Sequence, residues 1–234
     1  MRAWFRAMWW ITNQKGGVNA VGLQRLLGLG SYKTAWTCLH KLRRAMVRAG
    51  REQLLGRVEV DETVIGGERR GAHGWHADAK KALVVVAAEV RGEGIGRIRL
   101  RHVPDTKFAS LNKFVQEEIA PGSEIITDGH KGYLEISGLG YKHSPTPLYK
   151  NREVTSMVLG RAHRVASLLK RWLLGMHQGR VSREQLEHYL EEFTFRFNRR
   201  RSVDRGMLFY RLVQQSVATG PNPYQSLIKR SKQR

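Results

Sequence analysis

One stretch, residues 124–170, constrains the fold of this 234-residue chain more than any other. It opens with the run EIIT followed by Asp128 and Gly129, which is typical of a buried strand that ends in a carboxylate. The later segment HRVASLLKRWLLG carries apolar residues at helical spacing. His163 lies 35 positions after Asp128 (163 − 128), and Lys170 follows His163 by seven positions, which is two helical turns. His163 and Lys170 are therefore expected on one face of a helix.

A second acidic residue lies in another strand-like run, VEVDETVIGG. Val58 and Val60 alternate there with Glu59 and Asp61, so the two acids are expected on one face of the strand. An acid in a central strand is costly unless a cation satisfies it, which makes Asp61 a candidate metal ligand. The alternative is an edge strand with a solvated acid. Glu62 points to the opposite face and ranks below Asp61.

The chain around these acids supplies the elements of a mixed sheet. Strands are predicted at residues 57–65, 82–91, 96–103, 124–127 and 141–144, and helices at residues 106–119, 130–137 and 163–175. Three antiparallel strands, a crossing helix, then strand, helix, strand and a long helix follow the RNase H-like order. The predicted fold class is therefore α/β (α+β), an RNase H-like mixed five-stranded sheet with flanking helices.

A small helical region is predicted before the sheet. Two helices joined by a glycine turn form a helix-turn-helix pattern, and polar and basic residues at the start of the second helix suit the reading of a DNA groove. The alternative is a helical prefix that only packs on the next domain. The residues of this region expected to contact DNA are Tyr32, Lys33, Trp36, Lys41 and Arg43.

The charge balance indicates the kind of partner. The chain has 41 basic and 20 acidic residues, a net charge of +21 and a pI near 10.8, which attracts polyanions such as nucleic acid. No lipidation motif, long apolar segment or signal peptide indicates a membrane partner or secretion. The single cysteine, Cys38, excludes an internal disulfide and a Cys-rich zinc module. The expected location is the cytosol, in association with nucleic acid.

Two further stretches carry candidate DNA contacts. Trp75 lies between two histidines in a polar glycine-rich loop and is expected to stack on a base or sugar; the H-x-x-H pattern there is a weak metal signal. Arg199 and Arg200 end the last strong helical pattern, residues 183–201, and are expected to touch phosphates while the neighbouring aromatic rings fill the core. Residues 202–234 are predicted to be a less regular basic tail. The predicted domains are residues 1–52, residues 56–201 and residues 202–234.

Five motifs in the same order carry a family resemblance: SYKTAW-CLHKLRRAM, VEVDE, TDGHKGY, SLLKRWLLG and YLEEFTFRFNRR. Together they resemble bacterial insertion-sequence transposases of the DDE superfamily, in particular the ISXO-two-like branch. The resemblance implies cleavage at the ends of the element, attack of the freed 3′-hydroxyl on target DNA, and a homo-oligomer on paired ends. Relatives often carry a Cys-x-x-Cys zinc ribbon before the helical region, and this chain starts after that point.

The resemblance also implies a two-metal Mg²⁺ site on Asp61, Asp128 and the residue at position 163, with Lys170 and Arg171 as phosphate-contacting bases. His163 departs from the family pattern, which has an acidic residue or asparagine there. A neutral imidazole can still ligate a metal or act as a base, and it favours Mn²⁺. Glu153 is the alternative third carboxylate.

Two other functions stay open beside the transposase. One is an RNase H-like nuclease or junction resolvase, which would cut DNA without strand transfer. The other is a catalytically inactive DNA-binding remnant or repressor of the element, which the histidine at position 163 favours.

Overall fold

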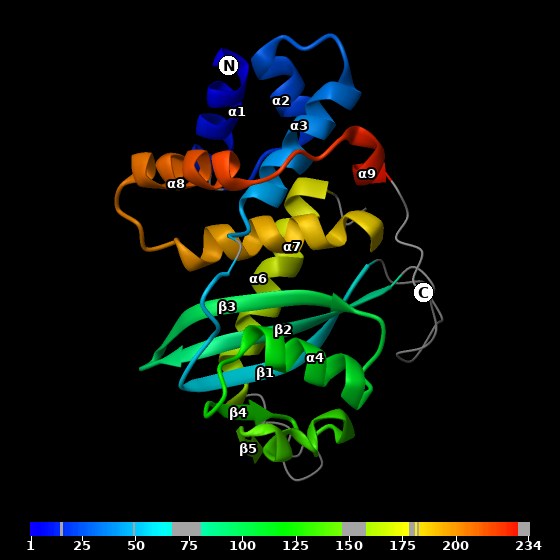
Figure 1. The fold of residues 1–234 in the computed structure, drawn as a ribbon, viewed down its shortest axis with the longest axis vertical. Coiled ribbons are helices and arrows are strands. Elements are labelled where there is room, and N and C mark those ends of the chain that lie inside the picture. Colours follow the sequence, from blue (N-terminus) through cyan, green and yellow to red (C-terminus); the bar gives the residue numbers. More distant parts are fainter. Residues whose placement is uncertain are drawn as a thin grey trace. The chain divides into compact units, whose positions relative to one another are not determined.

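The computed structural model describes residues 1–14, 16–48, 50–66, 81–146, 158–177, 181 and 183–228 (Figure 1). The chain divides into two compact units. One unit is the continuous segment Glu52–Arg171, and the other combines Met1–Arg51 with Trp172–Arg234. Within the described ranges, no helix is both long and apolar enough to cross a membrane.

The unit Glu52–Arg171 is built on one mixed sheet. Its strands are β1 (Arg57–Ile65), β2 (Ala82–Arg91), β3 (Gly94–Val103), β4 (Glu124–Thr127) and β5 (Lys142–Pro145). They are hydrogen-bonded in the order β3-β2-β1-β4-β5. β2 pairs antiparallel with β1 and β3, whereas β4 pairs parallel with β1 and β5. This arrangement confirms the predicted mixed five-stranded α/β sheet with flanking helices.

The alternation of side chains along β1 gives the sheet two different faces. Val58 and Val60 are buried in a core with Phe114 of helix α4 (Phe108–Glu118). The opposite face of β1 contacts helix α6 (Gly160–His177), whose first part belongs to the same unit. Two short 3₁₀ helices, η1 (Lys131–Tyr133) and η2 (Ile136–Leu139), connect β4 to β5.

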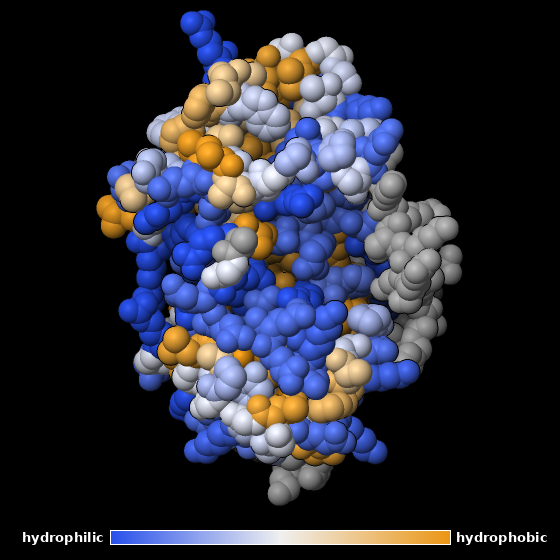
Figure 2. Space-filling model, viewed as in Figure 1, coloured by the Kyte–Doolittle hydropathy of each residue, from blue (hydrophilic) through white to orange (hydrophobic). Residues whose placement is uncertain are grey.

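The edge strand β3 carries a row of arginines that are paired within the unit. Arg97 Nη2 lies 2.8 Å from Glu89 Oε1, and Arg99 Nε lies 3.0 Å from Glu118 Oε2. Arg101 also pairs with Glu118, at 2.5 Å. Figure 2 shows hydrophilic surface over this strand. Charged side chains on an edge strand oppose pairing with another chain, and these three charges are balanced by the fold itself.

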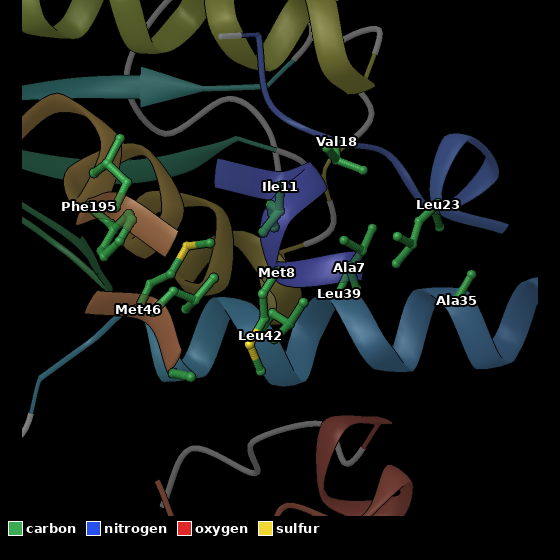
Figure 3. Close-up of a cluster of buried hydrophobic side chains, with 14 residues drawn as sticks. Ala7, Met8, Ile11, Val18, Leu23, Ala35, Leu39, Leu42, Met46 and Phe195 are labelled. Atoms are coloured by element: carbon green, nitrogen blue, oxygen red, sulfur yellow. The ribbon is translucent and has the colours of Figure 1, made fainter. Parts of the chain in front are cut away.

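The other unit is helical. Its helices are α1 (Arg2–Asn13), α2 (Ala20–Leu27), α3 (Tyr32–Ala45), the end of α6, α7 (Arg183–Asn198), α8 (Arg205–Ala218) and α9 (Tyr224–Ile228). Figure 3 shows its apolar core, in which Ile11 of α1, Leu39 of α3 and Phe195 of α7 are buried together. The heptad-like apolar spacing of α1 and α3 directs these side chains to one side of each helix.

The predicted turn between two N-terminal helices is present between α2 and α3. Asn19 caps α2, its side chain accepting the N–H of Gly22 at 2.7 Å. Gly28 ends α2 in the left-handed conformation, with φ of 64°, where glycine is favoured because it has no Cβ. Helix α2 therefore starts and ends where its residue types dictate.

The C-terminal part of the chain differs from the prediction. Residues 202–234 were expected to be an irregular tail, but they contain α8 and α9. Asp204 caps α8 by accepting the N–H of Gly206 at 2.7 Å, and Leu208 and Leu212 are buried in the helical core. Residues after Arg171 group with the N-terminal helices, so the domain boundary at residue 201 differs from the structural one. Each of these helices buries one apolar stripe in the helical core, and this burial decides the grouping. The local sequence shows the stripe but does not show which other helices will cover it.

Candidate active site

Asp61 lies on the central strand β1, at the point where β4 ends beside it. β1 and β4 pair in parallel register, with Glu59 opposite Ile126. Continuing that register brings Asp61 level with Asp128, the residue that follows Thr127 at the end of β4. Because neighbouring strands lie about 4.8 Å apart, the two carboxylates are held at one edge of the sheet.

His163 contacts Asp61 directly. Its Nε2 atom lies 3.1 Å from Asp61 Oδ2, with the histidine side chain 41% exposed and the aspartate side chain 19% exposed. Burial raises the pKa of Asp61, His163 opposes that rise, and the charges of Asp128 and Lys170 also act on it. The structure therefore brings together the predicted set, namely Asp61, Asp128, His163 and Lys170, around one carboxylate.

Asp128 is oriented by its own turn. Its Oδ1 accepts the backbone N–H of His130 at 2.9 Å, and Gly129 adopts φ of 79°. The Thr127 hydroxyl accepts the N–H of Gly129 at 3.1 Å and lies 2.9 Å from His143 Nε2 of β5. These hydrogen bonds hold the Asp128 carboxylate at the end of β4.

Glu62 lies on the other face of β1, as predicted, and has an unexpected partner. Tyr133 of η1 donates a hydrogen bond from its hydroxyl to Glu62 Oε1. Burial raises the pKa of Glu62 to about 7, Tyr133 opposes this, and Asp61 and Asp128 add to it. The motif TDGHKGY contains Tyr133, but nothing in its sequence indicates which acid it meets. Glu62 and Tyr133 are therefore neighbours of the site that sequence reasoning missed.

The donor set fits a divalent metal by its chemistry. Carboxylate oxygens suit Mg²⁺ and Mn²⁺, and an imidazole nitrogen shifts the preference towards Mn²⁺. In the part of the chain that the structure describes, no three His, Cys, Asp or Glu side chains already converge as a metal-binding group. If Asp61 and His163 both bound a metal ion, their bonds to the metal would replace the direct contact between the two side chains.

The candidate DNA-contacting residues of α3 lie partly at the surface. Tyr32 is 52% exposed and Lys33 is exposed, whereas Trp36 and Lys41 are half-buried. Lys33 Nζ lies 4.1 Å from the ring centroid of Tyr224 in α9. Lys33, Lys41 and Tyr224 are among the residues that line a cavity of roughly 410 Å³. The start of α3 therefore presents one cation, Lys33, beside an aromatic ring.

Arg43 has a different role from the predicted one. Its side chain is only 2% exposed, and its Nε lies 2.7 Å from Glu192 Oε2, which is fully buried. Arg43 also donates to the Val18 carbonyl at 3.1 Å. A guanidinium buried in this way cannot reach a phosphate, and we therefore remove Arg43 from the DNA-contacting set.

The remaining predicted phosphate contacts lie on α6 and at the end of α7. Lys170 and Arg171 are exposed. Arg199 stacks over the Phe195 ring at 4.1 Å, and Arg200 stacks over the Phe197 ring at 4.0 Å. The two rings are buried, as expected. The stacked guanidinium groups keep one planar face covered, so a phosphate would approach their edges.

Four residues that the sequence made candidates are not among those that the structure describes. Trp75, its flanking histidines and Glu153 lie outside the described residues.

The strand order β3-β2-β1-β4-β5 and the flanking helices give the Glu52–Arg171 unit the predicted RNase H-like α/β arrangement. Residues 53–198 match the family described as the ISXO2-like transposase domain, and the chain belongs to this family. No curated protein matches the chain. The crystal structure of a pre-cleavage Mos1 transpososome is similar at 13% identity over 90% of this chain and 77% of that chain, with a TM-score of 0.34. The family confirms the predicted kinship with insertion-sequence transposases of the DDE superfamily.

Proposed function

We propose that this chain is a DNA transposase that cuts phosphodiester bonds at the ends of an insertion sequence and transfers the freed strand into target DNA. The observation that carries the proposal is the contact of His163 with Asp61 beside Asp128, inside a domain of the transposase family. Asp61 and Asp128 occupy two of the positions that the family pattern expects to be acidic, and His163 occupies the third position, where the pattern has an acidic residue or asparagine.

Asp61, Asp128 and His163 would hold divalent metal ions, Mg²⁺ or Mn²⁺. When bound, such ions stabilise charge on the attacking and leaving oxygens of an in-line displacement. Lys170 and Arg171, exposed on α6 beyond His163, would bind the phosphates that flank the scissile bond and hold the DNA end in register. As an alternative to binding the metal, the half-exposed imidazole of His163 could take a proton from an incoming water or hydroxyl.

The helical unit would supply DNA binding. Tyr32, Lys33, Trp36 and Lys41 of α3 are the proposed contacts, with Arg199 and Arg200 adding phosphate contacts. Because a transposase joins two ends of one element, we further propose a homo-oligomer assembled on paired ends, working at the bacterial nucleoid.

The test is a cleavage and joining assay with Mg²⁺ or Mn²⁺, on a labelled duplex carrying the repeat that flanks the gene. The parent chain is compared with Asp61→Asn, Asp128→Asn and His163→Ala. We expect the parent to join ends to target DNA and each variant to lose at least about 100-fold in rate, since each removes a ligand of the same site.

Three outcomes would argue against parts of the proposal. Cleavage without joining would favour an RNase H-like nuclease or resolvase. Tight binding of the duplex with no cleavage would favour a DNA-binding remnant, a function with which the histidine at position 163 is compatible. Full activity in His163→Ala would show that the third ligand lies elsewhere, and Glu153 would be tested next.

A further inference from the structure

A second contact joins the same two elements that carry Asp61 and His163. Glu59 precedes Asp61 by two residues on β1, and Arg161 precedes His163 by two residues on α6. Glu59 is fully buried, and its Oε1 lies 2.9 Å from Arg161 Nη1. Because strand side chains alternate, Glu59 and Asp61 point to the same face of β1.

The Glu59 carboxylate also accepts hydrogen bonds from the backbone at the start of α6. Its Oε2 accepts the backbone N–H of Arg161 at 2.8 Å and the backbone N–H of Ala162 at 3.0 Å. The first N–H groups of a helix have no partners within the helix, and the helix dipole favours a negative charge there. A side chain of β1 thus caps α6 one residue before His163.

Arg161 links a third element to this contact. Its Nε donates to the Gly94 carbonyl at 3.0 Å, and its Nη2 donates to the Gly92 carbonyl at 2.7 Å. Gly92 lies in the turn between β2 and β3, and Gly94 is the first residue of β3. The Arg161 guanidinium therefore binds both β1 and the β2–β3 connection. Arg161 itself lies in the first turn of α6, so the three elements are joined at this residue.

These contacts leave the first turn of α6 little freedom. A buried carboxylate is costly unless it is paired and hydrogen-bonded, and within the described part of the chain the groups that donate to Glu59 belong to Arg161 and Ala162. A shift of α6 along β1 would break all of these hydrogen bonds to Glu59 together. The same shift would separate His163 from Asp61.

We propose that Glu59, acting through Arg161, is a positioning residue that sets His163 against Asp61. The geometric part of this proposal stands by itself, whereas its consequence for catalysis rests on the proposed transposase function. Glu59 touches no reacting atom and is not a catalytic residue.

The experiment compares full-length parent, Glu59→Gln and Arg161→Lys, with Glu118→Gln as the control. Glu118 forms a similarly buried pair with Arg99 in the same unit, away from Asp61 and His163. Four quantities are measured: the melting temperature, kcat and KM for cleavage of the labelled duplex, Mn²⁺ affinity, and the histidine-ring NMR signals. The His163 signal is assigned by its loss in His163→Ala, and its response to Asp61→Asn reports the contact between the two side chains.

We expect Glu59→Gln to lower Mn²⁺ affinity about 10- to 100-fold and kcat about 100-fold, with KM for DNA unchanged. The response of the His163 signal to Asp61→Asn should disappear in that background. Arg161→Lys, which keeps the charge and the two backbone N–H groups, should lose less. Glu118→Gln should lower the melting temperature without changing the other quantities.

The proposal is overturned if Glu59→Gln lowers the melting temperature as Glu118→Gln does but keeps the His163 response and the Mn²⁺ affinity of the parent. If Glu59→Gln does not fold, the same comparison is decided by Arg161→Lys, whose side chain is partly exposed. If the parent does not cleave DNA, the transposase function fails, and the NMR response still decides whether Glu59 positions His163.

Discussion

Glu62 shows how strongly one buried carboxyl depends on its neighbours. It shares a hydrogen bond with Tyr133 on the α4 side of β1, while Asp61 occupies the other side. Burial raises the pKa of Glu62 to about 7, and the charges of Asp61 and Asp128 contribute to the rise. The protonated form is therefore favoured in the folded chain over a range of pH in which an unfolded chain is ionised.

This raised pKa predicts the pH dependence of stability. The folded state holds a proton on Glu62 that the unfolded state releases above its ordinary pKa of 4.5. The stabilisation is thus complete below pH 4.5 and is lost as the pH rises through about 7. We expect the metal-free parent to lose about 3 kcal/mol of unfolding free energy over this range relative to Glu62→Gln.

Urea denaturation of both proteins in the presence of a chelator, at intervals from pH 4 to pH 8, measures this difference. Glu62→Gln is a suitable reference because its amide oxygen can still accept the Tyr133 hydrogen bond. A difference between the two proteins that does not change with pH would mean that the pKa of Glu62 is the same in the folded and unfolded states.

Arg43 links helices of the helical unit through a buried charge. Glu192 of α7 is held by Arg43 of α3 and by Arg196, and Arg196 also donates to the carbonyls of Ile11 and Gln14. Burial alone would raise the pKa of Glu192, but the two guanidinium groups lower it below its ordinary value. The charge network thus joins α1, α3 and α7.

Removal of Arg43 is expected to weaken this junction. Arg43→Met leaves Glu192 with one guanidinium in a buried site, which should cost about 3 kcal/mol of unfolding free energy. Arg44→Met is the matched control, because Arg44 is the next residue of α3 and is exposed; it should change stability by less than about 0.5 kcal/mol. Equal effects of the two substitutions in urea denaturation would contradict the buried role of Arg43.

The segment between β4 and β5 depends on one close approach of the backbone. A Cβ at Gly132 of η1 would lie 2.4 Å from the Thr106 carbonyl and 2.6 Å from Leu111 Cδ1. At Gly138 of η2, a Cβ would meet nothing within 4 Å. Only glycine therefore fits between η1 and the start of α4.

Gly132→Ala is expected to destabilise the chain by about 2 kcal/mol, because the added methyl group overpacks against a backbone oxygen. It should also disturb the adjacent Tyr133 and its hydrogen bond to Glu62. Gly138→Ala should change stability by less than about 0.5 kcal/mol. Thermal unfolding of the two variants tests the difference, and similar melting temperatures would refute it.

The net charge of +21 is not all available to DNA. Arginines such as Arg97 and Arg99 are neutralised by acids within the fold, whereas Lys33 and Lys41 line an open cavity of the helical unit. Charge in direct phosphate contact releases counterions, and charge paired within the protein does not.

This distinction predicts the salt dependence of DNA binding. Lys33→Gln and Lys41→Gln should each reduce the slope of log K against log salt by about 0.9, because each removes one phosphate contact. Arg97→Gln changes the net charge by the same amount and should leave the slope unaltered. Titrations of a labelled duplex at several salt concentrations measure the slopes, and equal effects of all three variants would indicate attraction by net charge alone.

The local sequence was sufficient to predict the strands of the sheet and the N-terminal helices. The alternation around Asp61, the strand that ends at Asp128 and the helical spacing of His163 with Lys170 were sufficient to predict the sheet and its candidate site. Periodicity reports which face of an element is buried, and strand ends bring side chains to one edge. The five short motifs were sufficient to identify the transposase family.

Tertiary structure alone decided which partner each buried group would meet. Arg43 was predicted to contact DNA, but in the structure it forms a buried ion pair with Glu192, 149 positions away. Leu208 and Leu212 made α8 part of the helical core where the local pattern suggested a tail. Glu59 capped α6, and Tyr133 met Glu62. Such pairings join residues far apart in the chain. They depend on the free energy of burying both partners together, and this free energy cannot be inferred from any single segment of the sequence.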